Sequence, residues 1–221
     1  MRALALVVVL ASTTAAADEG ELYLGAGASL EAAWLRHPLA KDDNPMQLSA
    51  SPSTMLPRLV TSARYGITNE LHLGLGLEAA LSANVVTNGV EGAGTRGQVV
   101  TGTYFELAAP LTTAWRIDSG YDVTGAVDLE AGPVLALWST SALVDPLRLD
   151  EKGRPVRLPF DVDDQLEVGA LIRIAAMVEW RVWNNLALRA GPAVTLSWAG
   201  TPGFHAGLVI EPTFVTAVGG H

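Results

Sequence analysis

Carboxylate and guanidinium side chains recur at alternate positions through much of this 221-residue chain. Side chains of a β-strand point alternately to its two faces, so residues with this spacing share one face. The set comprises Glu31, Arg58, Arg64, Glu78, Glu106, Arg116, Asp128, Glu130, Arg173, Glu179, Arg189 and Glu211. Because a buried charge without a partner is costly, a face that carries both signs predicts an ion-pair network.

The histidines offer little support for metal or proton-transfer chemistry. They stand at positions 37, 72, 205 and 221. We expect His72 near one end of its strand and His205 near the opposite end of another strand. These two side chains therefore cannot share a metal ion or a proton, and we expect interior histidines that are hydrogen-bonded and structural.

Threonines are the possible nucleophiles on the opposite, apolar face. Thr61, Thr101 and Thr113 lie there, but no His, Ser or carboxylate side chain stands beside them. A hydroxyl nucleophile needs an adjacent base. We therefore expect no catalysis on the apolar face.

The segment 139–164 is rich in carboxylates, which are ligands that divalent cations prefer. Asp161, Asp163 and Asp164 end this segment, but their spacing does not match a calcium loop. We favour a solvated acidic loop over a cation site, and we expect no cofactor.

The elements that position these residues are strands, because the apolar residues alternate with polar ones at period two. Even positions from Leu22 to Trp34 are apolar, and Leu73, Leu75 and Leu77 alternate with His72 and Glu78. Eight segments follow this rule: 22–34, 58–65, 70–85, 98–117, 121–137, 165–182, 186–198 and 204–216. No segment shows a convincing helical period.

Short and long connections alternate along the chain. Hairpin turns are expected at 66–69, 118–120 and 183–185, where Gly or Asn can adopt positive φ. Long loops are expected at 37–57, 86–97 and 138–164, with a shorter connection at 199–203. This pattern favours an up-and-down barrel in which the last strand pairs with the first.

The short turns also predict strand registers. Pairing Ile117 with Tyr121, and Val182 with Leu186, sets charged side chains opposite each other. One register at the first turn does the same. The predicted pairs are Arg116 with Asp122, Glu179 with Arg189, Arg58 with Glu78, and Arg64 with His72.

Aromatic residues distinguish a membrane barrel from a soluble one. They fall at the strand ends of the apolar face, as expected for girdles at two membrane interfaces. The loop-end row is Trp34, Phe105, Trp198 and Phe204, and the turn-end row is Tyr65, Trp115, Tyr121, Trp180 and Phe214. A lipocalin-like barrel would instead point apolar side chains inward, whereas the inward set here is charged or small.

Composition and the first residues indicate export. Residues 1–17 have the charged start, short apolar run and small residues of a secretory signal peptide, which leaves 18–221 as one barrel domain. The apolar run is too short to span a bilayer as a helix. The chain has no cysteine, and its net charge of −9 is the wrong sign for a nucleic-acid partner.

The segment Arg64-Tyr65-Gly66-Ile67-Thr68-Asn69-Glu70-Leu71 resembles the strand–turn–strand motif that is common in the small outer-membrane β-barrel proteins of Gram-negative bacteria. The resemblance covers the whole mature chain. It implies an all-β, eight-stranded antiparallel up-and-down transmembrane β-barrel in the outer membrane. It also implies contacts with outer-membrane lipid, lipopolysaccharide and the barrel assembly machinery. The carboxyl end departs from the family, whose members usually end on an aromatic residue, because this chain runs past Phe214 to His221.

Several functions are compatible with this architecture, since fold alone does not settle function. We expect a non-enzymatic outer-membrane protein with a plugged, charge-lined interior that serves envelope integrity or surface interaction through its extracellular loops. The first alternative is a narrow pore or hydrophobic-solute channel. The second is a lipid A-modifying enzyme.

Overall fold

The computed structural model describes residues 20–36, 52–88, 99–118, 123–157 and 163–217. The predicted signal peptide lies outside these residues. Within them, no helix is long and apolar enough to cross a membrane. The described strands are β1 (Glu21–Trp34), β2 (Thr54–Gly66), β3 (Leu71–Asn88), β4 (Val99–Ala108), β5 (Leu111–Asp118), β6 (Val123–Leu149), β7 (Pro155–Arg157), β8 (Gln165–Trp183), β9 (Leu186–Ala199) and β10 (Thr201–Ala217).

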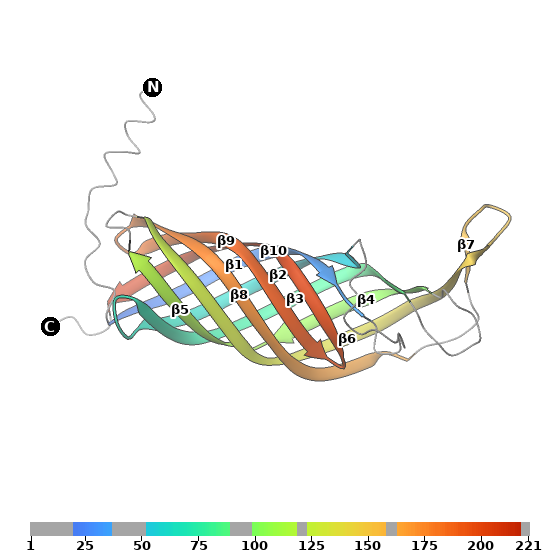
Figure 1. The fold of residues 1–221 in the computed structure, drawn as a ribbon, viewed down its shortest axis with the longest axis horizontal. Helices are drawn as coiled ribbons and strands as arrows, with labels where there is room; N and C mark the ends of the chain where they lie inside the picture. The colour runs from blue at the N-terminus through green and yellow to red at the C-terminus, as the bar shows by residue number, and fades with distance from the viewer. Residues whose placement is uncertain (1–19, 37–51, 89–98, 119–122, 158–162, 218–221) are drawn as a thin grey trace, which may run out of the picture.

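The strands form one closed antiparallel barrel (Figure 1). Successive strands of the barrel wall pair with each other, and β10 returns to pair with β1 from Phe204 opposite Trp34 to Ala217 opposite Glu21. β4 and β5 both lie between β3 and β6, so together they make one barrel strand. β7 pairs with β6 outside the barrel wall, and the barrel described here therefore has eight strands, as predicted.

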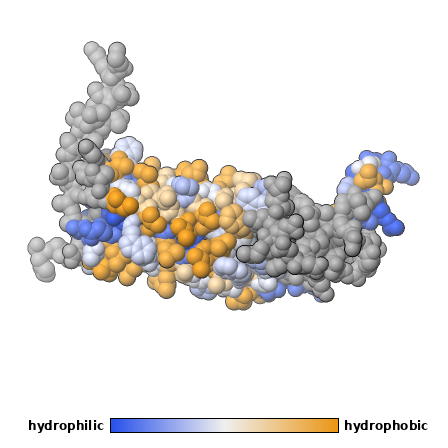
Figure 2. All heavy atoms as spheres, in the orientation of Figure 1, coloured by the Kyte–Doolittle hydropathy of each residue, from blue (hydrophilic) through white to orange (hydrophobic). Residues whose placement is uncertain are grey.

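Burial alternates along the strands as the hydropathy pattern predicts. In β9 buried and exposed residues alternate almost without exception from Ala187 to Ala199. Leu73, Leu75 and Leu77 are exposed on the outer face, whereas His72 and Glu78 are buried inside the barrel. Figure 2 shows the resulting apolar outer surface. The predicted orientation of these side chains is confirmed.

The predicted strand 98–117 is interrupted at Ala109 and Pro110. Proline has no amide hydrogen to donate, so it breaks the ladder of hydrogen bonds. The Pro110 carbonyl accepts a hydrogen bond from the Gly76 amide at 2.8 Å, and the Ala109 amide donates to the Pro133 carbonyl at 3.2 Å. These bonds keep the interrupted strand within the barrel wall.

The prediction of a loop at 138–164 was wrong for much of its length. β6 continues to Leu149 and folds back onto β7, which makes a hairpin that projects from the loop end of the barrel (Figure 1). The run Ala142-Leu143-Val144 and the proline at position 146 break the alternation of residue types there, so the period-two pattern did not reveal the strand. The connection at 199–203 is also shorter than predicted, because Gly200 adopts a φ of 70° and makes a tight turn between β9 and β10.

Two predicted registers were wrong. Arg58 lies opposite Ala80 and Arg64 opposite Gly74, two positions away from the predicted Glu78 and His72. Thr68 stabilises the turn, because its hydroxyl accepts hydrogen bonds from the backbone amides of Glu70 and Leu71. These bonds set the turn length and with it the register of β2 against β3. Arg116 lies opposite Ala126 rather than Asp122, because the turn after Asp118 is longer than three residues. Asp122 itself lies outside the described residues.

The register at the Asn184–Asn185 turn was predicted correctly at the charged pair. Glu179 lies opposite Arg189. The turn itself is tighter than predicted, since Trp183 pairs directly with Leu186. A register shift between Arg181 and Trp183 compensates for the missing turn residue and restores the predicted pairing.

Candidate functional site

The barrel interior contains two clusters of ion pairs, stacked along the barrel. The first, here called the loop-side cluster, gathers one residue from each of seven strands: Glu31, Arg58, Glu78, Glu106, Glu130, Arg173 and His205. The second, the turn-side cluster, comprises Arg64, Arg116, Asp128, Glu179, Arg189 and Glu211. Inward-pointing alternate residues of the strands supply every member.

Arg58 is at the centre of the loop-side cluster. Its guanidinium donates to Glu106 at 2.6 Å, to Glu78 at 3.0 Å and to Glu31 at 3.3 Å. The Nδ1 atom of His205 lies 3.2 Å from Arg58 Nη2 and 3.4 Å from Glu31. All of these side chains are almost completely buried, so each charge depends on its neighbours for compensation.

Arg173 links the remaining carboxylates of the loop-side cluster. It contacts Glu78 directly, Glu130 at 3.1 Å and Glu31 at 3.3 Å, and its Nε donates to the hydroxyl of Thr195 at 2.9 Å. The cluster therefore holds four carboxylates against two guanidiniums.

Arg189 is the centre of the turn-side cluster. It contacts Asp128 at 2.8 Å, Glu211 at 3.0 Å and Glu179 at 3.1 Å. Two further arginines complete the cluster. Arg64 bonds Glu211 at 3.0 Å, and Arg116 bonds Glu179 at 2.9 Å. Three carboxylates balance three guanidiniums here.

A small cavity of about 20 Å³ lies between the clusters. Its lining includes Arg64 and Asp128 on one side and Glu130 and Arg173 on the other. A polar cavity of this volume has room for one or two water molecules at most. The two clusters are therefore nearly contiguous.

Aromatic side chains bound the clusters toward the turn end. The ring of Tyr23 lies 4.6 Å from that of His72, and the guanidinium of Arg116 lies over it at 5.8 Å. The Tyr23 hydroxyl donates to Glu21 at 2.8 Å, and Arg181 donates to the same carboxylate at 2.7 Å. This layer joins side chains of β1, β3, β5 and β8 near the turns.

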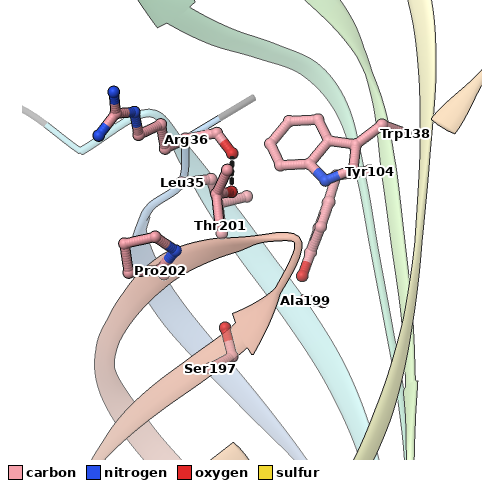
Figure 3. Close-up of a pocket in the computed structure, with 9 residues that line it drawn as sticks. Leu35, Arg36, Tyr104, Trp138, Ser197, Ala199, Thr201 and Pro202 are labelled. Atoms are coloured by element: carbon pink, nitrogen blue, oxygen red, sulfur yellow. Dashed lines mark hydrogen bonds between the residues drawn. The ribbon is translucent and has the colours of Figure 1, made fainter. Parts of the chain in front are cut away.

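An apolar layer, here called the loop-end cap, bounds the other end. It includes Leu35, Leu56, Tyr104, Trp138 and Leu171, all buried. The rings of Tyr104 and Trp138 lie 4.7 Å apart, and the Tyr104 hydroxyl donates to Glu106 in the loop-side cluster at 2.5 Å. Figure 3 shows these two rings beside a pocket of only about 10 Å³.

The structure places the sequence-predicted residues as follows. Arg58 contacts Glu78 diagonally, although the two are not opposite each other, and Arg189 contacts Glu179 as cross-strand partners. Arg116 also joins Glu179, in place of the predicted Asp122. Arg64 bonds Asp128 and Glu211, whereas His72 packs against Tyr23.

Other inward-facing residues make contacts that hairpin registers did not predict. Glu31 and Glu106 reach arginines on strands that are not their neighbours, whereas Glu130 contacts Arg173 directly opposite it on the neighbouring strand β8. Their alternation with apolar residues showed that they point inward, but the sequence contains no signal for pairing across the barrel. Among the described residues no group of His, Cys, Asp or Glu side chains suits a metal ion. Asp161, part of the cation alternative, lies outside those residues.

A scan of protein-family models found no match, and a search of curated proteins found none either. Solved structures do resemble this one. Ail, the attachment invasion locus protein of Yersinia pestis, has 12% identity and a TM-score of 0.50 over 90% of this chain and 99% of that one. Neisserial surface protein A has 13% identity and a TM-score of 0.45 over 90% and 100%.

OprG, an outer membrane protein of Pseudomonas aeruginosa, has 8% identity and a TM-score of 0.44 over 91% of this chain and 98% of its own. Identities this low concern the fold alone. The likeness to Ail agrees with the closed antiparallel sheet and its apolar outer face. The chain thus has the fold of the small eight-stranded outer-membrane β-barrel proteins.

Proposed function

We propose that this chain is a non-enzymatic, non-conducting integral outer-membrane protein that serves surface interaction or envelope integrity through its extracellular loops. The observation that carries the proposal is the interior. Two adjoining ion-pair clusters lie between the loop-end cap and the Tyr23 layer, and the cavity between them measures only about 20 Å³, which supports a plugged interior. In an eight-stranded barrel the interior is only wide enough for side chains, so a filled section leaves no path for a solute.

The outer face supports insertion in a bilayer. Its exposed aromatic residues form the two expected rows, with Trp198 at the loop end and Trp115, Trp180 and Phe214 at the turn end. Trp34 and Phe204 of the loop-end row pack together with ring centroids 5.4 Å apart. Tyr121 lies outside the described residues. Lipid and the outer leaflet's lipopolysaccharide are the partners proposed for this surface, and the barrel assembly machinery for its insertion.

The surroundings of the outward threonines argue against lipid-modifying chemistry. The Thr61 hydroxyl donates to the Leu77 carbonyl at 3.0 Å, and its strand neighbours across the sheet are Ala26 and Leu77. Thr113 lies between Leu73 and Leu129. Neither hydroxyl has a general base beside it, and an acyl-transfer nucleophile needs one.

Planar-bilayer recording of the refolded protein tests the proposal. We expect no stable open level. The matched variant Trp138→Ala removes part of the loop-end cap and leaves both clusters intact, so we expect no stable open level for this variant either. Long-lived conducting steps in the unmodified protein would overturn the proposal. Conducting steps in the variant alone would mean that the loop-end cap, and not the ion-pair clusters, blocks conduction.

A further inference from the structure

The exposed basic residues are distributed very unevenly. Among the residues that the structure describes, every Lys or Arg in the exposed class lies on the hairpin formed by the end of β6 and β7, residues 144–157, here called the tip hairpin. These residues are Arg148, Lys152, Arg154 and Arg157. The other described arginines are buried or half-buried, most of them in the interior clusters. Within the described part of this chain of net charge −9, the exposed positive charge is therefore gathered on the tip hairpin.

Two of the three carboxylates of the tip hairpin, Asp145 and Asp150, are paired with its basic residues. Asp145 is buried and lies 3.9 Å from Arg148. Asp150 accepts bonds from the backbone amides of Lys152 and Arg154 and from the Arg154 guanidinium at 2.8 Å. These bonds hold the pKa of Asp150 below its usual range. Glu151 is the one fully exposed acid among these residues, so the outward-facing charge is positive.

The tip hairpin stands well beyond the membrane surface. On β6 the loop-end aromatic row is level with Leu137, which pairs with Phe105, and the strand continues to Leu149. At the usual rise and barrel tilt, this extension reaches roughly 25–30 Å along the membrane normal. The headgroup region of a leaflet is only about 5–7 Å thick. The basic residues are therefore too far out to bind the phosphates of phospholipid headgroups.

The basic side chains also extend along the hairpin. Arg148 lies on β6, Lys152 and Arg154 at the turn, and Arg157 on β7 opposite Val144. A row of this kind, spread over several residues of a two-stranded ribbon, matches charges repeated along a polymer better than one compact anion. Arg154 also closes the turn through Asp150, so the row is carried on an ordered support.

We propose that the tip hairpin binds an extracellular linear polyanion, a polysaccharide with repeated anionic groups. This inference rests on the proposed function, because it names the class of partner for a surface-interaction role. Binding of this kind is driven largely by release of counterions, and it weakens steeply as salt concentration rises.

Binding of dextran sulfate to the full-length protein in nanodiscs of phosphatidylcholine tests the proposal, with neutral dextran as the control ligand. The variant carrying Arg148→Gln, Lys152→Gln and Arg157→Gln keeps the Arg154–Asp150 pair at the turn. We expect it to bind about tenfold more weakly or worse, with a shallower dependence on salt, because fewer counterions are released. Glu151→Gln, on the same hairpin, is expected to bind as well as or more tightly than the unmodified protein.

Equal binding of dextran sulfate by the triple variant and the unmodified protein would overturn the proposal. The unmodified protein binding neutral dextran as tightly as dextran sulfate would also overturn it. Charge-dependent association with phosphatidylglycerol vesicles in place of dextran sulfate would assign the basic row to lipid instead. Retention of heat-modifiable migration on an SDS gel shows that each variant is folded. If the protein does not bind dextran sulfate but also shows no conduction in planar bilayers, the polyanion proposal fails and the proposed function stands. The two proposals are thus tested separately, because conduction tests only the proposed function.

Discussion

At the scale of single residues, Arg189 is the most strongly connected member of the turn-side cluster. It is almost completely buried and contacts Asp128, Glu179 and Glu211 within 3.1 Å. Replacing Arg189 by Gln leaves three buried carboxylates short of a counter-charge. We expect the free energy of unfolding to fall by about 3–5 kcal/mol, the usual range for breaking one side of a buried ion pair.

A double-mutant cycle with Glu179→Gln measures the coupling between the two side chains. Urea unfolding in lipid vesicles, followed by tryptophan fluorescence, supplies the free energies. We expect a coupling within the range of about 0.5–3 kcal/mol for residues in contact. Recovery in the double variant should be partial, because Asp128 and Glu211 still lack Arg189. Additive effects would mean that Glu179 and Arg189 do not interact in the membrane. Arg181→Gln, at a less deeply buried pair near the turn end, is the control and should be milder.

One cross-strand pair within a hairpin was predicted correctly from the sequence, whereas pairs across the barrel could not be predicted. Glu179 and Arg189 are ten positions apart around a short turn, and counting outward from Asn184 and Asn185 was enough to pair them. Arg58 and Glu106 are 48 positions apart and meet because the barrel closes. The tilt of the strands and the length of the side chains decide which inward arginine contacts which carboxylate. The alternation of residue types contains no information on either.

At the scale of elements, the break between β4 and β5 depends on the glycines beside it. A Cβ atom added to Gly132 would lie 2.5 Å from the Cα of Pro110 and 2.6 Å from the Ala109 carbonyl oxygen. Both are backbone atoms and cannot move without disturbing the wall. We expect Gly132→Ala to lower the free energy of unfolding by about 1–3 kcal/mol, as overpacked sites do.

Gly125 provides the matched control on the same strand. A Cβ atom there would meet the Ile117 carbonyl oxygen at 3.9 Å, which is ordinary contact. Gly125→Ala should therefore leave stability unchanged or slightly improved, since alanine restricts the unfolded chain more than glycine does. Equal effects of the two substitutions in the same vesicle assay would show that the Pro110 break adjusts freely.

Strand positions were predicted well where a turn-forming residue followed a regular alternation. The strands around Asn184 and Asn185 begin and end within a residue of the predicted limits. The prediction failed where the alternation was irregular, as in the extension of β6 to Leu149, and where one proline interrupted a segment whose alternation continued past it. Turn length was the weakest part, because side-chain bonds such as those of Thr68 decide it.

At the scale of the whole molecule, the barrel could be predicted because its two faces have opposite chemistry along every strand. Leucine and valine point outward, while arginine and glutamate point inward, which is the reverse of a soluble protein. Alternation fixed the number of strands, and the distribution of short and long connections fixed their order. The tip hairpin could not be predicted on this basis, because it lies outside the bilayer and neither face meets lipid.

Leu77 and Leu149 test whether the outer face contacts lipid. Leu77 lies midway on β3 between Leu73, which pairs with Tyr65 of the turn-end row, and Leu81, which pairs with Phe105 of the loop-end row. The side chains of Leu77 and Leu149 are similarly exposed, at 54% and 60%, but Leu149 lies on the tip hairpin. Arginine near the bilayer midplane of such a barrel lowers stability by roughly 2–4 kcal/mol.

We therefore expect Leu77→Arg to lose about that much free energy of unfolding and Leu149→Arg to lose almost none. The contrast arises because a guanidinium at Leu77 must give up its hydration, whereas at Leu149 water still surrounds it. Both variants are to be unfolded from the same phosphatidylcholine vesicles. A similar small loss at both positions would mean that the leucine-rich face of β3 is in contact with water, and the placement of the two aromatic rows at the membrane interfaces would then be wrong.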